Sequence, residues 1–364
     1  MATLKDGKGT LALAAFDSNA ELKRHELGRP ATGPKDVSIE VKYCGMCHSD
    51  LHAANGDWGM NYFPLVPGHE IAGVVKDVGC DVTKFKKGDN VGVGCFVESC
   101  GECKLCECGK QNYCSGACQT YGTPFPEGKG HDECAGESTN GGYTSNIMVK
   151  QDFVYSVPEG MELKYVGPLL CAGITMFSPL NKHVLKKGGN KTVGIVGFGG
   201  LGLMGIKLAK AMGCDVTVLS RSVDKKEQAD QVGADILSHE DEEALQMSAG
   251  KFDVIIDTVS VHHEINKILP TLKVGGSYVL IGVIAKPMKI SPMLLIRGNY
   301  SIEGSLIGGI PETQEMLEFC SKHNIQPKIK VIHAKDANAQ FKELADGTAD
   351  VERAVIDMST LAEL

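Results

Sequence analysis

The stretch Lys191-Thr-Val-Gly-Ile-Val-Gly-Phe-Gly-Gly-Leu-Gly202 decides how the second half of this 364-residue chain folds. It begins as a buried strand, and the residues from Leu203 to Met212 continue as an amphipathic helix. The glycines between them follow the pattern G-x-G-x-x-G, which permits a tight turn and a close approach of the backbone to a pyrophosphate. The helix N-terminus behind the turn favours anions. We therefore predict a dinucleotide site formed by Gly197, Gly199, Gly200, Leu201 and Gly202.

The pattern around this stretch predicts a doubly wound parallel sheet. Further strand patterns at residues 215–219, 252–256, 277–281 and 300–303 alternate with helix patterns. The chain up to about residue 160 differs, because it consists of short strand patterns joined by irregular loops. The predicted fold class is thus α/β, with a β-rich domain first and a doubly wound domain second. The segment after about residue 325 loses this alternation, and we expect it to return to the first domain.

The end of the second strand distinguishes between the two nicotinamide cofactors. An NAD site carries Asp or Glu there to hold the ribose hydroxyls, whereas this chain has Leu219-Ser-Arg-Ser222. A carboxylate would repel the 2′-phosphate of NADP, and serine and arginine would bind it. One charge-assisted hydrogen bond contributes about 1.5–3 kcal/mol, or about 10- to 150-fold in affinity. We predict NADP(H), bound through Ser220, Arg221, Ser222 and Lys225.

Four cysteines with C-x2-C-x2-C-x7-C spacing form a candidate metal site: Cys100, Cys103, Cys106 and Cys114. Four thiolates close a tetrahedron around zinc and leave no position for substrate, so such a site would be structural. The spacing leaves two other interpretations open, a four-cysteine iron–sulfur site and four free thiols. Cys108 and Cys118 also lie close enough in sequence to exchange with a ligand.

A second metal site is indicated by the stretch from Tyr43 to Glu70. It contains Cys44, Cys47 and the run Pro67-Gly-His-Glu70, and thiolates and imidazoles so close together suggest zinc. A site with few protein ligands would leave a coordination position open for chemistry. Spacing alone pairs Cys44 with Cys47 as a chelating C-x-x-C.

Composition limits the classes of protein that fit. The formal net charge of −8 argues against general nucleic-acid binding, and no apolar run approaches the length of about 18 residues expected of a membrane span. The first ten residues carry charges and lack the apolar core of a secretory signal. Fourteen cysteines without such a signal favour metal binding over disulfides. We expect a soluble cytoplasmic protein with neither a nucleic-acid nor a membrane partner.

With both sites in place, the chain resembles the zinc-containing medium-chain alcohol dehydrogenases, and among them the NADP-dependent cinnamyl alcohol dehydrogenase branch. The motifs that carry the resemblance are spread over nearly the whole chain: 44–50, 67–73, 88–92, the four-cysteine lobe (about 95–118), 169–175, 197–202, 257–263 and 315–319. The resemblance implies a GroES-like catalytic domain (1–165), a Rossmann NADP-binding domain (166–307) and a C-terminal segment that returns to the first domain (308–364). It also implies a homodimer, paired through the edge strand at 301–306.

The resemblance changes the ligand set of the catalytic zinc. It implies Cys47, His69 and Cys171 as ligands, with Glu70 as a carboxylate that can enter when water or substrate leaves. Cys44 then becomes a buried neighbour rather than a ligand. The chain would carry two zinc ions, one catalytic and one structural.

The resemblance also implies roles around this zinc. Asp50 would hydrogen-bond the ligand histidine and fix its tautomer. A proton relay is implied at Ser49, His52 and Asp57. Further cofactor contacts are implied at Thr175, Thr258, Val283 and Ser305.

The implied reaction is hydride transfer between NADP(H) and an aromatic or aliphatic alcohol or aldehyde. The implied pocket residues are Trp58, Met60, Tyr121, Ile284, Leu306 and Ile307. Leu306 stands where the family often has an aromatic residue, and the 115–142 loop is longer than in plant cinnamyl enzymes, so a broad aldehyde reductase fits better than a lignin-specific one. Two alternatives stay open: an NADPH-dependent reductase of an activated C=C or iminium, and a non-enzymatic zinc-binding interaction protein.

Overall fold

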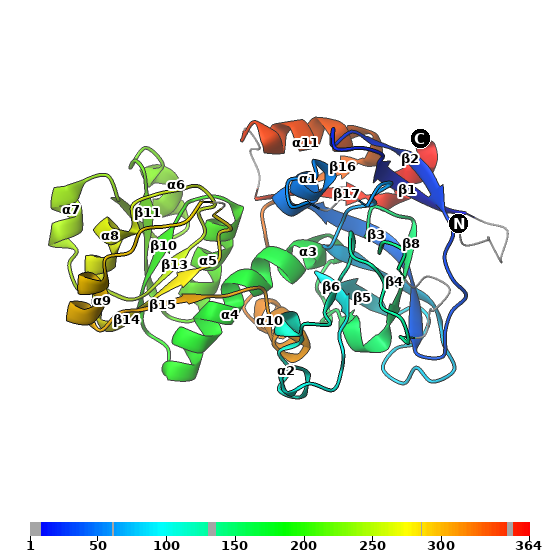
Figure 1. Cartoon of the computed structure of the whole chain (residues 1–364), viewed down its shortest axis with the longest axis horizontal. Helices are drawn as coiled ribbons and strands as arrows, with labels where there is room; N and C mark the ends of the chain where they lie inside the picture. Colours follow the sequence, from blue (N-terminus) through cyan, green and yellow to red (C-terminus); the bar gives the residue numbers. More distant parts are fainter. Residues whose placement is uncertain (1–8, 60–61, 130–135, 285, 348–351) are drawn as a thin grey trace. The chain divides into compact units, whose positions relative to one another are not determined.

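The computed structural model describes residues 9–59, 62–129, 136–284, 286–347 and 352–364, which fold into two compact units (Figure 1). Unit 1 comprises Met1–Cys171 and Gly308–Leu364, and unit 2 comprises Ala172–Ile307. Unit 2 is therefore one continuous segment inserted between two parts of unit 1.

Unit 1 is built around a seven-stranded sheet with the order β16-β17-β3-β4-β5-β9, to which β8 is added through β3. β17 comes from the end of the chain and pairs antiparallel with β3, the strand that leads into Cys47. Apolar side chains alternate into the core along β3, as expected of a half-buried strand. The strands are β3 (Asp36–Met46), β4 (Ile71–Val78), β5 (Asn90–Val93), β8 (Asn146–Lys150), β9 (Tyr155–Ser156), β16 (Ile329–His333) and β17 (Arg353–Asp357).

Two ribbons and a set of helices complete unit 1. The ribbons are antiparallel pairs, β1 (Thr10–Ala15) with β2 (Leu22–Leu27) and β6 (Phe96–Glu98) with β7 (Cys118–Gln119). The α-helices are α1 (His48–Ala54), α2 (Lys104–Glu107), α3 (Leu163–Pro168), α10 (Ile310–Lys322) and α11 (Ala337–Ala345). Short 3-10 turns lie at Gln111–Tyr113, Gln151–Phe153, Ala334–Asp336 and Met358–Glu363.

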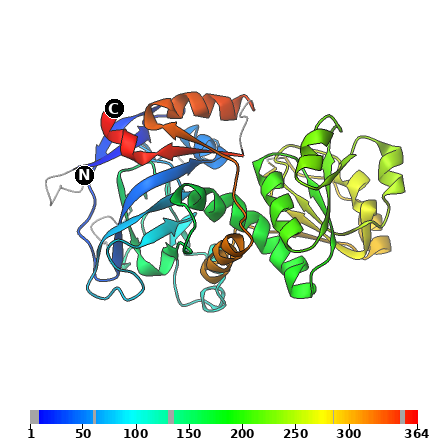
Figure 2. The same ribbon diagram turned by 180° about the vertical axis from the view of Figure 1, so that it is seen from behind.

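Unit 2 is a six-stranded parallel sheet in the order β12-β11-β10-β13-β14-β15, with helices on both of its faces (Figure 2). The strand order reverses between β10 and β13, where doubly wound sheets bind ligands at the carboxyl ends of their strands. The strands are β10 (Thr192–Val196), β11 (Asp215–Ser220), β12 (Asp235–Ser238), β13 (Phe252–Asp257), β14 (Leu272–Leu280) and β15 (Ser301–Gly304). The helices are α4 (Ile174–His183), α5 (Gly200–Ala211), α6 (Lys226–Gln231), α7 (Glu242–Met247), α8 (Ile265–Ile268) and α9 (Pro292–Gly298).

These two architectures confirm the predicted fold class, a β-rich GroES-like domain with a doubly wound parallel sheet. β2 and β12 were not predicted, because Leu22–Leu27 is mostly charged and Asp235–Ser238 is only four residues long. The helical run Leu163–Lys187 is long and apolar enough to span a membrane, but 72% of its most apolar window is buried, as in the core helix of a folded domain.

Candidate active site and metal centres

Cys47 is held at the start of helix α1. It is the residue before the helix, and its backbone N–H donates to Asp50 Oδ2 at 2.8 Å, which satisfies a donor that the helix itself leaves free. The Cys47 thiol lies 3.6 Å from Ser49 Oγ in the first turn. The local helix start therefore fixes a thiol and a hydroxyl side by side.

Asp50 joins this helix to His69. The buried carboxylate accepts from Gly68 N at 3.0 Å and His69 Nδ1 at 3.1 Å through Oδ1, and from Tyr143 OH at 3.2 Å through Oδ2. A bond from Nδ1–H to a carboxylate leaves Nε2 as the nitrogen with a free lone pair. Gly68 has a φ of +102°, and an added Cβ would lie 2.6 Å from the Tyr143 ring. Glycine is required at this turn because no side chain fits the approach to Tyr143.

Cys171 reaches the same place from a different element. It lies in the single π-turn Leu169–Gly173 between α3 and α4, directly after Pro168. Such turns recur at functional sites because they redirect a side chain within a helix. The Cys171 sulfur lies 3.3 Å from His69 Nε2.

Glu70 completes the cluster and has an uncommon environment. Its carboxylate is fully buried, and the Nε of Arg353 on β17 lies 3.3 Å from Oε1, without hydrogen-bond geometry. Burial raises the pKa of Glu70 to about 7, although the Arg353 charge acts in the opposite direction. Both carboxylate oxygens lack a hydrogen-bond partner among the described residues. A buried carboxylate without such partners is costly unless a cation lies nearby.

These four side chains form a donor set that fits zinc. The candidate ligand atoms of Cys47, His69, Glu70 and Cys171 all lie within 4.8 Å of one another. Two thiolates and one imidazole are typical of a catalytic zinc site, and a carboxylate oxygen of Glu70 could serve as a further ligand. The hydrogen bond from Cys171 lowers the pKa of the Cys47 thiol well below its usual range and raises that of Cys171.

The predicted relay residues lie on and beside α1. Ser49 and His52 lie one turn apart on the same helix. His52 Nδ1 is 2.8 Å from Asp57 Oδ2, and both side chains are nearly half exposed. Ser49 thus lies beside the buried thiol of Cys47, and the pair of His52 and Asp57 lies at the surface.

The predicted pocket residues are dispersed between both units. Within unit 1, the buried Tyr121 ring lies 5.7 Å from the His69 ring, and the exposed Trp58 ring lies 5.4 Å from that of His52. Met60 lies outside the described residues. Within unit 2, Leu306 is exposed, whereas Ile284 and Ile307 are partly buried.

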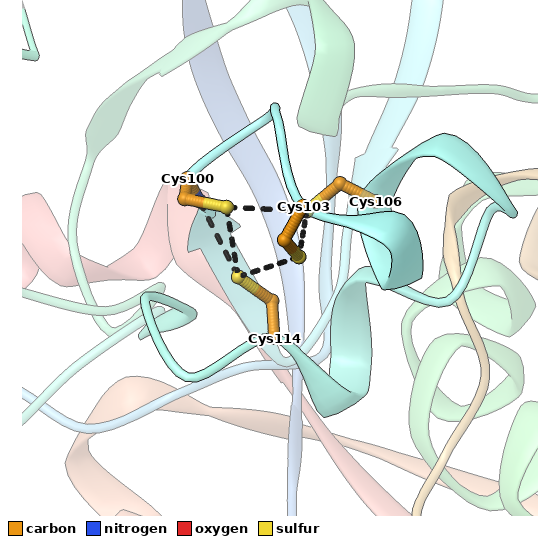
Figure 3. Close-up of side chains that lie close together, drawn as sticks. All are labelled: Cys100, Cys103, Cys106 and Cys114. Carbon is orange, nitrogen blue, oxygen red and sulfur yellow. Dashed lines mark hydrogen bonds between the residues drawn. The ribbon is translucent and has the colours of Figure 1, made fainter.

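The second metal centre is the four-cysteine lobe, where the thiols of Cys100, Cys103, Cys106 and Cys114 point toward one another (Figure 3). Four of the sulfur–sulfur distances are 3.4, 3.6, 3.8 and 3.9 Å. Zinc–sulfur bonds of about 2.3 Å in a tetrahedron require sulfur–sulfur distances of about 3.8 Å, so the lobe fits zinc closely. The Glu102 backbone N–H lowers the pKa of Cys100 to about 6. Cys118, considered above as an exchangeable ligand, instead contacts Thr123 Oγ1 at 3.4 Å.

The dinucleotide turn has the predicted backbone geometry. Gly197 has a φ of +98°, Gly199 precedes α5, and an added Cβ at Gly202 would lie 2.3 Å from Gly197 O. Gly200 and Leu201 form the first turn of α5, so their amides are among those that a helix leaves free. Of the further predicted contacts, Thr258 donates to Val196 O beside this turn. Of the other predicted cofactor contacts, Thr175 is buried in α4 and Val283 is exposed. The backbone N–H of Ser305 donates to Leu280 O.

The predicted phosphate-binding residues follow β11. Arg221, Ser222 and Lys225 are exposed, and Ser220 ends the strand. Ser222 Oγ donates to Asp224 Oδ2 at 2.8 Å, so this acid lies closer to the predicted phosphate position than its sequence position suggested. Ser238 Oγ on the neighbouring β12 donates to Arg221 O at 2.9 Å and fixes the backbone of the loop.

Arg353 and Cys95 are among the contributors that were not predicted from the sequence. Arg353 lies in the C-terminal strand, and no motif connects it to Glu70, which is almost three hundred residues earlier. Cys95 has its pKa lowered by a hydrogen bond with Cys171, and it stands alone in a glycine-rich segment of the sequence. Only the pairing of β17 with β3 and the fold of unit 1 bring these groups to the site.

Comparison with known proteins identifies the family. Residues 33–159 match the alcohol dehydrogenase GroES-like domain, and residues 200–322 match the zinc-binding dehydrogenase family. The chain is 45% identical to cinnamyl alcohol dehydrogenase 8 of Arabidopsis thaliana (97% of this chain, 96% of the relative) and 45% identical to a probable formaldehyde dehydrogenase of Bacillus subtilis (97% and 98%). The cinnamyl alcohol dehydrogenase of Helicobacter pylori, solved with NADP(H), is 41% identical, with a TM-score of 0.84 over 96% of this chain and 98% of that one. The chain thus belongs to the zinc-containing medium-chain alcohol dehydrogenases, a family of oxidoreductases, as its motifs predict.

Proposed function

We propose that this chain is a zinc- and NADP(H)-dependent alcohol dehydrogenase that interconverts aldehydes and primary alcohols. The observation that carries the proposal is the cluster of Cys47, His69, Glu70 and Cys171, whose ligand atoms lie within 4.8 Å of one another. In the direction of reduction, an aldehyde, NADPH and a proton give an alcohol and NADP⁺. Zinc, when bound, polarises the substrate oxygen, and the nicotinamide supplies the hydride.

The residues of the chain then have two tasks: one group orients the ligand His69, and another group moves a proton. Asp50 holds His69 with Nε2 toward the cluster through its bond to Nδ1. Ser49 Oγ, beside the Cys47 thiol, gives the proton to the product oxygen or takes it in the reverse direction. His52, paired with Asp57 at 2.8 Å, exchanges that proton with solvent, since both side chains are nearly half exposed. General acid–base transfer of this kind contributes about 10²- to 10⁴-fold in rate.

The preference for NADP(H) is supported by charge at the end of β11. Ser220 and Arg221 stand where an NAD site carries a carboxylate, and Lys225 adds a second cation. A solved relative binds NADP(H). Asp224 opposes the preference, and its bond with Ser222 would have to open when the phosphate binds.

The substrate class we propose is broad. Two relatives of equal identity carry names for very different aldehydes and alcohols, formaldehyde and cinnamyl alcohol. Tyr121 and Trp58 offer aromatic faces near His69 and His52, on which an aromatic substrate can stack. We also propose the domain limits 1–165, 166–307 and 308–364, a cytoplasmic location, and a homodimer paired through β15, the edge strand of the unit 2 sheet.

A screen of NADPH oxidation tests the proposal. The substrates are cinnamaldehyde, benzaldehyde, short aliphatic aldehydes and an activated enone, each measured with NADPH and with NADH. Oxidation of NADPH by several aldehydes supports the proposal. Turnover of the enone alone would favour the alternative C=C reductase, and equal or better kcat/KM with NADH would refute the cofactor preference.

A further inference from the structure

The four-cysteine lobe contacts the point at which the chain re-enters unit 1. Helix α10 begins there, and its first amide, Ile310 N, is one of the donors that a helix leaves unsatisfied. That amide donates to Gln111 Oε1 at 3.1 Å. Gln111 Nε2 in turn donates to Cys106 O at 3.3 Å. One side chain therefore connects the backbone of a metal-ligand residue to the first turn of α10.

Backbone packing reinforces this connection. A Cβ added to Gly309 would lie 1.8 Å from Gly109 O, so the two backbones touch with no room for a side chain. A Cβ added to Gly109 would meet Pro311 at 3.0 Å. Both views show α2 of the lobe beside α10 (Figures 1 and 2). The lobe thus holds residues 309–311 through three separate contacts.

The segment immediately before this anchor is strained. Ile307 has a φ of +39°, a left-handed conformation that β-branched residues rarely adopt. Such a conformation persists only where the surrounding structure fixes it from both sides. On one side Ser305 N donates to Leu280 O at 3.0 Å, within the sheet of unit 2. On the other side the chain is fixed at Gly309 and Ile310 by the lobe.

We propose that Gln111 is a positioning residue for substrate selection, through which the four-cysteine lobe fixes the return segment and keeps Ile307 in its left-handed conformation. The proposal rests on the proposed function and on the place in the substrate pocket that the family resemblance implies for Ile307. The lobe then has a task beyond local stability. It sets the backbone of a pocket residue without contacting the substrate.

The substitutions Gln111→Ala and Gln111→Glu, with Gln246→Ala on the exposed face of α7 as a matched control, test the proposal. In Gln111→Ala the Ile310 amide loses its acceptor, so we expect hydrogen exchange of residues 305–314 to accelerate about two- to tenfold. We expect zinc content to stay at two ions per chain, and the ratio of KM values for cinnamaldehyde and acetaldehyde to change at least about threefold while kcat changes less. Gln111→Glu should restore the protection of the Ile310 amide, because a carboxylate accepts the same bond and suits a helix N-terminus. It should restore the ratio of KM values only in part, because a carboxylate cannot donate to Cys106 O as Gln111 Nε2 does.

Exchange equal to that of the control would overturn the proposal, as would faster exchange with an unchanged ratio of KM values. If the parent enzyme reduces no aldehyde, the proposed function fails instead. The exchange measurement still shows in that case whether Gln111 anchors the segment.

Discussion

Replacing Asp50 by asparagine tests how the active site is held together. The carboxylate accepts four hydrogen bonds, two at each oxygen, from Cys47 N, Gly68 N, His69 Nδ1 and Tyr143 OH. Asparagine has nearly the same shape but presents an NH₂ group in place of one oxygen. If the NH₂ group takes the place of Oδ1, Gly68 N and His69 Nδ1 both face a donor. If it takes the place of Oδ2, Cys47 N loses its acceptor, whereas the Tyr143 hydroxyl can rotate and accept instead.

The expected magnitude follows from these bonds. Each hydrogen bond to a charged group contributes about 1.5–3 kcal/mol, so losing one or two costs about 1.5–6 kcal/mol, shared between folding and metal binding. In either orientation His69 Nδ1 loses its charged acceptor, which weakens the control of the His69 tautomer. Substitution of such a supporting carboxylate typically weakens metal affinity about 10- to 100-fold.

A chelator competition assay with zinc measures the effect. We expect Asp50→Asn to bind the catalytic zinc 10- to 100-fold more weakly while the lobe retains its zinc, since Asp50 does not contact the lobe cysteines. Asp57→Asn, at the exposed partner of His52, is the matched control and should retain both ions. Zinc affinity within about twofold of the parent protein would show that Asp50 does not support His69 as described.

Three further predictions concern the cofactor, the pH and the C-terminal strand. Arg221→Ala should lower kcat/KM for NADPH about 10- to 150-fold and leave NADH nearly unaffected, as steady-state kinetics will show; equal losses with both cofactors would contradict the phosphate assignment. The pKa of Cys171 is raised, first by its hydrogen bond with Cys47, so zinc must displace its proton. Displacing one proton raises zinc affinity by up to about tenfold per pH unit, so affinity should rise between about pH 6 and 8, and a flat competition profile would count against this. Arg353→Met should lower the free energy of unfolding, measured in urea, by about 3–5 kcal/mol, because it leaves Glu70 buried without its cation. Adding Glu70→Gln to Arg353→Met should restore part of the loss. A decrease of less than about 1 kcal/mol in Arg353→Met would show that the pair contributes little to stability.

Much of the fold and of the donor set can be predicted from the sequence, because the signals are local. The turn Gly197–Gly202 lies between a buried strand and a helix, and the lobe cysteines lie within fifteen residues of one another. Each pattern indicates its local geometry directly, since a tight turn requires glycine and a tetrahedral zinc site of this kind requires four thiolates. The family resemblance added Cys171, which is an ordinary apolar cysteine by its spacing alone.

Arg353, Tyr143 and Gln111 could not be predicted in the same way. Their partners are distant in the sequence, and each contact depends on how strands or loops pair in the folded chain. Arg353 reaches Glu70 only because β17 pairs with β3, and Gln111 reaches Ile310 only because Gly109 and Gly309 pack without side chains. The hydroxyl of Tyr143 reaches Asp50 from a loop with no regular periodicity. Residues of this kind have no local pattern that indicates their role.

The zinc content of the parent protein and of Cys171→Ala is the decisive measurement for the catalytic metal site. We predict two zinc ions per chain in the parent and one in the variant, with the remaining ion in the four-cysteine lobe and NADPH-dependent aldehyde reduction abolished. Cys171→Ala with two zinc ions, or with its aldehyde reduction intact, would contradict the assignment of Cys47, His69 and Cys171 as the catalytic metal site.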